Sequence, residues 1–280
     1  MTAGRKHFNR SICLAALATL GAVAPAPAEC PAARGPRAAL IAGVYVVGEA
    51  AAIALRHNDW WQPPARSFHT IWGSSPSKGQ DALLHASISY QASRIAGAAW
   101  RWACVSDPAA AWLGAATGFA LGIPKEIGDG LHQNGFSGTD MLWTAIGSGV
   151  PALHRTWAPS RIAQLKVFYW PSAEFRNRTG PLPQLENDYA GQRYFLTVNP
   201  ARTGGAGSWP RWLGLAIGHS VPSWATVPPE HVWFLALDVD LAGLPVKARW
   251  WRSLTAVVDQ IHIPLPGIRI QGGQTKAGVY

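Results

Sequence analysis

The hydrophobic period of the chain changes near residue 165, and this change constrains the fold more than any other feature. Before it, apolar residues recur at helical spacing in stretches rich in Ala, Gly and Leu. After it come short runs of aromatic and branched residues separated by Gly, Pro and Asn. The sequence therefore predicts an α+β fold: an N-terminal bundle of about four apolar helices followed by a β-containing C-terminal region with one further helix.

The expected helical unit covers residues 38–157, with helices at 38–55, 80–104, 109–123 and 139–153. The third helix carries glycines at a spacing of four, which form a ridge without side chains: Gly114, Gly118 and Gly122. Such a ridge allows another helix to approach closely. Pro124 should end or kink this helix because it lacks an amide hydrogen.

The expected β-containing region covers residues 158–280. Its strands are predicted at 165–170, 193–199, 212–218 and 231–239. A helix at 247–259 and a Pro-rich tail beginning at Ile263 should follow. We expect this region to pack on the helical unit.

The first 28 residues have the features of a signal peptide. Arg5 and Arg10 belong to a positive segment, an apolar run follows, and cleavage is expected after Ala28. An uncleaved membrane anchor is the alternative. Cys30 follows Ala28-Glu29, which does not resemble a lipoprotein box, so lipidation is not expected. Cys30 and Cys104 could pair in an oxidising periplasm or stay as free thiols, and the sequence leaves both options open.

Composition points to the cell envelope. The chain is 48% hydrophobic and only 14% charged, contains 15 Trp, and carries a formal net charge of +9. Trp suits a membrane interface, and a basic balance favours anionic partners such as lipid head groups. The stretch at 38–55 approaches the length of a bilayer span. No zinc-finger spacing or RNA-binding aromatic motif is present in the sequence, so we expect a membrane lipid or envelope component as partner and not nucleic acid.

Four polar residues in the apolar helical stretch are the candidate site. Asp81 and His85 are four apart, and Glu126 and Asp129 are three apart, so each pair shares one helix face. Carboxylates and imidazoles on facing helices can hold a divalent metal or act as acid and base. The same residues can instead form a closed polar network that fixes helix register. The sequence leaves these interpretations open, for Asp81, His85, Glu126 and Asp129 alike.

Two neighbours of these four residues have simpler interpretations. Lys125 is expected to be a solvated or head-group-facing cation. Asp140 is expected to cap the fourth helix rather than to act as a ligand. Standard hydrolase, kinase, dehydrogenase and zinc-protease motifs are missing from the sequence, which lowers the expectation of a standard enzyme.

The order of several short motifs resembles the YfiM-like family of bacterial proteins, domain-of-unknown-function family 2279. The motifs are Trp60-Trp61, Arg66-Ser67-Phe68-His69, Asp81 through His85, Glu126-x-x-Asp129-Gly130, Gly135-Phe136-Ser137, Asn187-Asp188-Tyr189 and Asp238-x-Asp240. A similar pattern occurs in VanZ-like membrane proteins. This chain has Ala82 where the family commonly has Lys, and Trp143-Thr144 where it commonly has an Asn. The resemblance implies a periplasmic location more than an activity.

These observations favour an exported envelope protein, periplasmic or associated with the membrane, with a structural or interaction role. The alternative is a lipid- or cell-wall-modifying enzyme that uses a buried His/Glu/Asp cluster.

Overall fold

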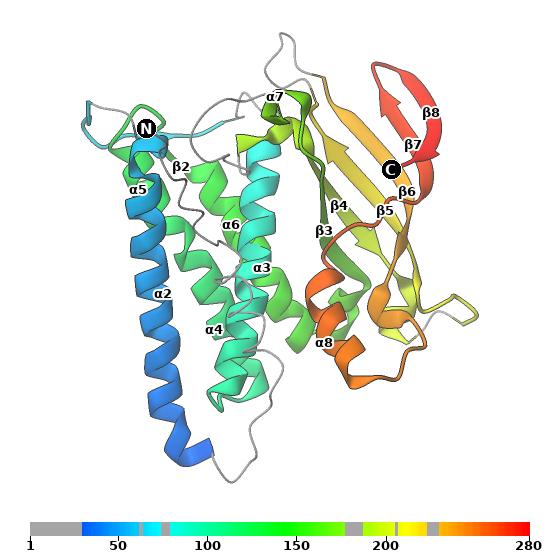
Figure 1. Cartoon of the computed structure of the whole chain (residues 1–280), viewed down its shortest axis with the longest axis horizontal. Helices are drawn as coiled ribbons and strands as arrows, with labels where there is room; N and C mark the ends of the chain where they lie inside the picture. Colours follow the sequence, from blue (N-terminus) through cyan, green and yellow to red (C-terminus); the bar gives the residue numbers. More distant parts are fainter. Residues whose placement is uncertain (1–29, 62–63, 74–78, 177–186, 205–206, 223–229) are drawn as a thin grey trace, which may run out of the picture.

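The computed structural model describes residues 30–280, apart from 62–63, 74–78, 177–186, 205–206 and 223–229. Helices dominate up to residue 156, and a six-stranded sheet follows from residue 163, so the predicted α+β class is confirmed. The helices lie side by side at one end of the molecule and the sheet lies at the other (Figure 1). The predicted signal peptide and its cleavage site lie outside the described residues.

The helical part contains one long helix, three of intermediate length and one short one. They are α2 (Cys30–Trp60), α3 (Gln80–Trp102), α4 (Asp107–Ala120), α5 (Gly122–Gly130) and α6 (Gly138–Thr156). The predicted third helix ends at Ala120, earlier than expected, and Pro124 lies in the first turn of α5. Proline is tolerated there because the first amides of a helix have no intrahelical acceptor.

The predicted glycine ridge is a close helix contact. A Cβ on Gly114 would lie 2.6 Å from the Ser93 carbonyl oxygen, and one on Gly118 would lie 2.8 Å from that of Ser89. Gly122 instead faces Thr144 of α6. Only glycine permits the approach of α4 to α3, so the expected packing of this ridge is confirmed.

The sheet is an antiparallel meander in chain order. Its strands are β3 (Ala163–Tyr169), β4 (Gln192–Val198), β5 (Leu213–Ser220), β6 (Val232–Val239), β7 (Pro266–Gln271) and β8 (Gln274–Val279). The first four match the predicted strands, whereas the β7–β8 hairpin corrects the predicted Pro-rich tail. Gly272 and Gly273 have φ of 54° and 76°, the conformation that a two-residue hairpin turn requires.

Three smaller elements complete the fold. A two-residue parallel pair joins β1 (Thr70–Ile71) to β2 (Phe136–Ser137). The helix α7 (Ala173–Arg176) follows β3, and α8 (Arg249–Val258) fulfils the prediction of one helix late in the chain. The strand pair β1–β2 brings the segment after α2 against the start of α6.

The two faces of the sheet differ. On one face Phe195, Ala216, Val232 and Phe234 form a buried apolar cluster. On the other face Leu215, Ile217 and Leu235 are exposed. They lie on one face because the register pairs Leu215 with Leu237 and Ile217 with Leu235. Alternation along the strands therefore leaves apolar side chains on both faces.

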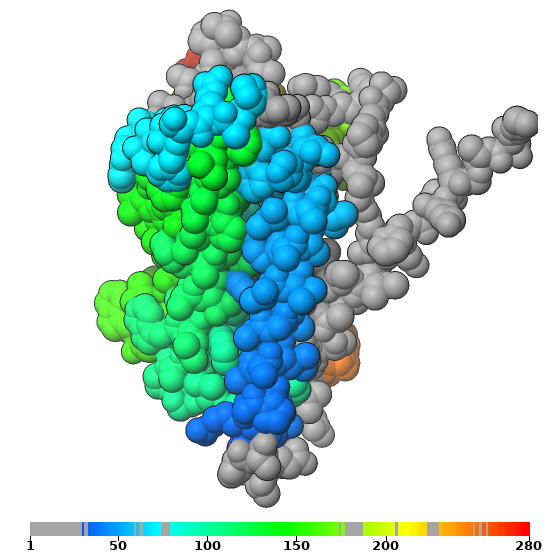
Figure 2. Space-filling view, turned by 90° about the vertical axis from the view of Figure 1, so that its left-hand side faces the viewer, coloured from blue at the N-terminus to red at the C-terminus, as the bar shows by residue number. Residues whose placement is uncertain are grey.

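The helix α2 forms the edge of the molecule remote from the sheet (Figure 1). Its first residue, Cys30, forms a disulfide with Cys104 at the end of α3, which decides between the two options that the sequence left open. The Arg37 guanidinium donates to the Trp102 carbonyl, and the Tyr45 hydroxyl donates to the Thr117 carbonyl. The space-filling view shows that α2 is uncovered along its length on this side (Figure 2).

Candidate functional site

Three helix beginnings and one remote turn meet around His85. Asp81 and His85 come from the first turns of α3, Glu126 from α5, and Asp140 from the first turn of α6. His85 Nε2 lies 3.9 Å from Asp81 Oδ1, 3.8 Å from Glu126 Oε1 and 4.0 Å from Asp140 Oδ2. Three carboxylates thus surround one imidazole nitrogen, each beyond hydrogen-bond length. We call these four residues the His85 cluster.

Polar neighbours fix the orientation of each member. The Thr144 hydroxyl lies 3.3 Å from His85 Nδ1, and the backbone N–H of Ser137 donates to Glu126 Oε2 over 3.0 Å. The Tyr189 hydroxyl donates to Asp81 Oδ1 over 2.8 Å, from a 3₁₀ turn more than 100 residues away in the chain.

The His85 cluster is buried at one side and reachable at the other. The exposed fraction of the side chain is 1% for Glu126, 11% for His85, 14% for Asp140 and 24% for Asp81. Burial raises the pKa of Glu126, which Lys125 lowers only in part. Burial, and then the charge of Asp81, raise the pKa of Asp140. The surroundings therefore oppose the accumulation of negative charge that this residue set creates.

Asp129 does not reach His85 and belongs to a neighbouring group. Lys125 Nζ binds Asp129 Oδ2 over 2.7 Å and lies 3.5 Å from Glu126 Oε1, while the Trp61 indole donates to Asp129 Oδ1 over 2.8 Å. Burial opposes the charge of Lys125, but Asp129 and Glu126 outweigh it and raise its pKa. The expectation of a solvated Lys125 is wrong, because its ammonium group is engaged by two carboxylates.

Local packing determines how α5 is covered and where α6 begins. A Cβ on Gly128 would overlap the Trp61 ring, so Trp61 can lie against α5 only because this residue is glycine. Ser137 caps α6, since its hydroxyl accepts the Asp140 N–H over 3.1 Å. The expectation that Asp140 caps the helix is therefore wrong, and its carboxylate faces His85 instead.

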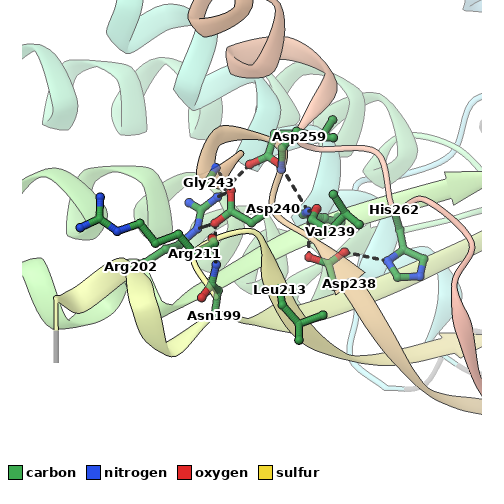
Figure 3. Close-up of polar contacts among 12 residues, drawn as sticks. Asn199, Arg202, Arg211, Leu213, Asp238, Val239, Asp240, Gly243, Asp259 and His262 are labelled. Atoms are coloured by element: carbon green, nitrogen blue, oxygen red, sulfur yellow. Dashed lines mark hydrogen bonds and ion pairs between the residues drawn. The ribbon is translucent and has the colours of Figure 1, made fainter. Parts of the chain in front are cut away.

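A second polar network, which was not predicted, lies in the C-terminal region. Lys166, fully buried, binds Asp238 over 2.8 Å and Asp259 over 3.4 Å. His262 Nδ1 lies 3.0 Å from Asp238 Oδ1, and Arg202 Nη2 binds Asp259 Oδ2 over 2.8 Å (Figure 3). We call this set the Lys166 network. Arg202 also forms an ion pair with Asp240, whose carboxylate accepts a hydrogen bond from the Asn199 side-chain amide (Figure 3).

A third polar contact joins the two halves of the molecule. Gln80, next to Asp81, donates to the Gln192 carbonyl over 2.9 Å and lies 3.1 Å from His219 Nδ1. His219 Nε2 is 2.9 Å from His231 Nδ1. Burial, followed by the effect of His231, lowers the pKa of His219 to about 4. His219 is thus a neutral histidine that joins the two halves through hydrogen bonds.

Comparison with known proteins gives one finding for this chain. Residues 72–156 match the model of a family described as predicted periplasmic lipoprotein, DUF2279. No significant match was found among curated proteins or among solved structures. The description agrees with the predicted export to the periplasm or cell envelope. The resemblance drawn from the sequence is confirmed over residues 72–156, the segment that holds most of the residues around His85.

Proposed function

We propose that the protein is a membrane-associated component of the cell envelope whose helix α2 lies in the bilayer surface. The observation that carries this proposal is the outer face of α2. Leu40, Val44, Val47 and Leu55 recur at helical spacing, and all four side chains are exposed. The stretch Ala33–Asn58 is long and apolar enough to cross a membrane, and none of its most apolar window is buried.

Two polar residues of α2, Arg37 and Tyr45, face the protein and donate to carbonyls of the neighbouring helices. Ile41 is the one large apolar residue that is buried among the described side chains of this helix. A helix that hides polar groups and exposes apolar ones is the reverse of a soluble surface helix. Lipid on the outer side would cover the exposed apolar side chains of α2 and remove them from water.

The neighbouring helices support the same orientation. Trp112 and Leu113 of α4, and Leu142 and Ile146 of α6, are exposed. The contacts between helices are made by small residues, as in the cluster of Ala111, Ala115 and Ala152. Small residues inside and large apolar residues outside are typical of helices packed in lipid. We therefore regard residues 30–156 as a bundle adapted to a membrane surface.

An orientation along the membrane fits the rest of the fold better than a crossing. The Cys30–Cys104 disulfide at the start of α2 requires an oxidising compartment. The other end of α2 leads to Trp61, which bonds Asp129 within the same folded unit. A helix in the membrane plane keeps both ends, and the sheet on the remote side, in the periplasm.

The disulfide also bears on how the chain is held at the membrane. The sulfur of Cys30 is bonded to Cys104, so it is not available for the thioether that would link a lipid. Embedding α2 supplies attachment without a lipid on this residue. The match to a family of predicted lipoproteins therefore concerns location here more than the chemistry of anchoring.

The test is sedimentation with liposomes of the purified protein, followed by a carbonate wash. Val47→Asp should lower the membrane-bound fraction about tenfold, because it places a charge on the apolar face that would be buried in the lipid. The matched control is Leu235→Asp, which places a charge on an exposed apolar position of the sheet. The proposal fails if carbonate removes the wild type, or if both variants bind equally well. Circular dichroism checks that each variant is folded.

A second candidate is the lipid- or cell-wall-modifying enzyme. The observation in its favour is the proximity of Glu126, with its raised pKa, to His85 at 3.8 Å, next to the partly exposed Asp81. Incubation with phospholipid or peptidoglycan fragments and mass spectrometry would detect a product. Product formation that is unchanged in Glu126→Gln would remove this candidate.

A further inference from the structure

We propose that the His85 cluster binds a divalent transition-metal cation such as Zn²⁺ or Mn²⁺. The ligands are His85 Nε2 and one carboxylate oxygen each from Asp81, Asp140 and Glu126. The proposal is independent of the membrane attachment, because none of these residues lies on α2.

The ligand atoms converge on a common point. The metal-ligating atoms of Asp81, His85 and Asp140 all lie within 4.8 Å of one another. Glu126 Oε1, 3.8 Å from His85 Nε2, supplies a fourth atom from the buried side. Ligands at about 2.0–2.2 Å from Zn²⁺ are separated by roughly 3.4 Å in a tetrahedron. Side-chain rotations that move the ligand atoms by up to roughly 1 Å would therefore complete the coordination.

The outer contacts have the pattern of a metal centre. A ligating histidine normally bonds its second ring nitrogen to a polar group, and ligating carboxylates are themselves hydrogen-bonded. The Thr144 hydroxyl contacts the second ring nitrogen of His85. The Ser137 N–H donates to Glu126, and the Tyr189 hydroxyl donates to Asp81. The Ser137 N–H occupies Glu126 Oε2, so that Oε1 is the oxygen that faces His85.

The cluster carries more negative than positive charge. Lys125 lies 2.7 Å from Asp129 and 3.5 Å from Glu126, so one ammonium group is shared by two carboxylates. His85 lies 3.8–4.0 Å from the carboxylates of Asp81, Glu126 and Asp140, and these separations are too long for hydrogen bonds. Several carboxylates close together in partly buried surroundings repel one another, and a divalent cation among them would offset that repulsion.

The donor types indicate the class of metal. Ca²⁺ and Mg²⁺ take oxygen ligands, whereas imidazole together with carboxylates suits Zn²⁺, Mn²⁺ and related ions. The partly exposed Asp81 side chain gives the ion a route to the site. A water molecule could complete the coordination at that side.

The experiment is titration calorimetry of the full-length purified protein, stripped of metal with a chelator and then titrated with Zn²⁺. We expect one ion per chain, with an affinity lowered at least about 100-fold in His85→Ala and about tenfold in Thr144→Val, which removes the outer contact. The matched control is His132→Ala, because His132 contacts the Gly128 carbonyl and not the cluster. Its affinity should equal that of the wild type.

A second variant, Asp140→Asn, keeps the shape of the side chain and tests the site even if His85→Ala does not fold. It should weaken Zn²⁺ binding and change the visible spectrum of bound Co²⁺, while circular dichroism stays unchanged. Binding weaker than millimolar in the wild type would overturn the proposal in favour of a closed polar network. Tight binding that survives both His85→Ala and Asp140→Asn would overturn it equally, since the ion would then sit elsewhere.

Discussion

The His85 cluster and the Lys166 network both combine carboxylates with a histidine, but they differ in how closely the carboxylates are paired with cations. In the Lys166 network cations meet carboxylates at 2.8–3.4 Å, and the Lys166 amine is fully buried. In the His85 cluster three carboxylates stand 3.8–4.0 Å from a single imidazole. The first pairs its carboxylates with cations at short range, whereas the second holds its carboxylates around the imidazole at longer range. Completeness of pairing, more than burial, thus separates a structural network from a candidate site.

The largest expected effect tests the completeness of the Lys166 network. Lys166→Met should destabilise the protein by about 3–5 kcal/mol, because it leaves Asp238 and Asp259 buried without their cation. The measurement is urea unfolding followed by circular dichroism. The double variant Lys166→Met/Asp238→Leu should recover part of the loss, since it also removes one carboxylate. A loss below about 1 kcal/mol would mean that the network is hydrated and less closed than its distances indicate.

The next effect concerns His219, at the junction of the two regions. Its pKa of about 4 lies below the ordinary value of 6.5, so the folded state binds the proton less well than the unfolded state. The stability is then fully present above pH 6.5 and falls as the pH drops toward 4, by roughly 3 kcal/mol at most. Unfolding measured across this range should show a smaller loss in His219→Gln. His154, whose pKa is also lowered to about 4, remains in both proteins, so their difference isolates His219.

A third prediction asks whether the rigid contact below the His85 cluster holds its helices in place. Gly118→Leu should cost about 1–3 kcal/mol, because the side chain would enter the backbone of α3 near Ser89. The matched control is Gly149→Ala in α6, where nothing lies within 4 Å of an added Cβ. That variant should be neutral or slightly stabilising. Equal unfolding midpoints for the two variants would contradict the close packing of α3 and α4.

The sequence predicted the part of the site that local spacing can reveal. Asp81, His85 and Glu126 were found because polar residues at helical spacing stand out in apolar helices. Asp140 was misassigned because Ser137-x-x-Asp140 also fits a helix start, where either residue could cap. Tyr189 could not be found, since its turn meets α3 only through the packing of the sheet on the helices.

The Lys166 network escaped prediction for a different reason. A lysine or aspartate in a strand normally marks the solvent face, and only the register shows that Lys166 pairs with Phe195 on the buried face. The β7–β8 hairpin was missed because Pro264 and Pro266 suggested a coil. Pro266 in fact begins β7, a position where the lack of an amide hydrogen is tolerated.

The smallest effect is the sharpest comparison of the two regions, because it should change sign with metal. Without metal, Glu126→Gln should slightly stabilise the protein, since burial disfavours the Glu126 charge and the amide oxygen still accepts the Ser137 N–H. With saturating Zn²⁺ the same substitution should destabilise the protein relative to the wild type, because only the wild type gains the full free energy of Zn²⁺ binding. Asp238→Asn in the Lys166 network should destabilise under both conditions, since its partner Lys166 stays charged and buried. Thermal unfolding with Zn²⁺ and with chelator measures all four values. An effect of Glu126→Gln that keeps one sign in both conditions would place the His85 cluster with the closed networks.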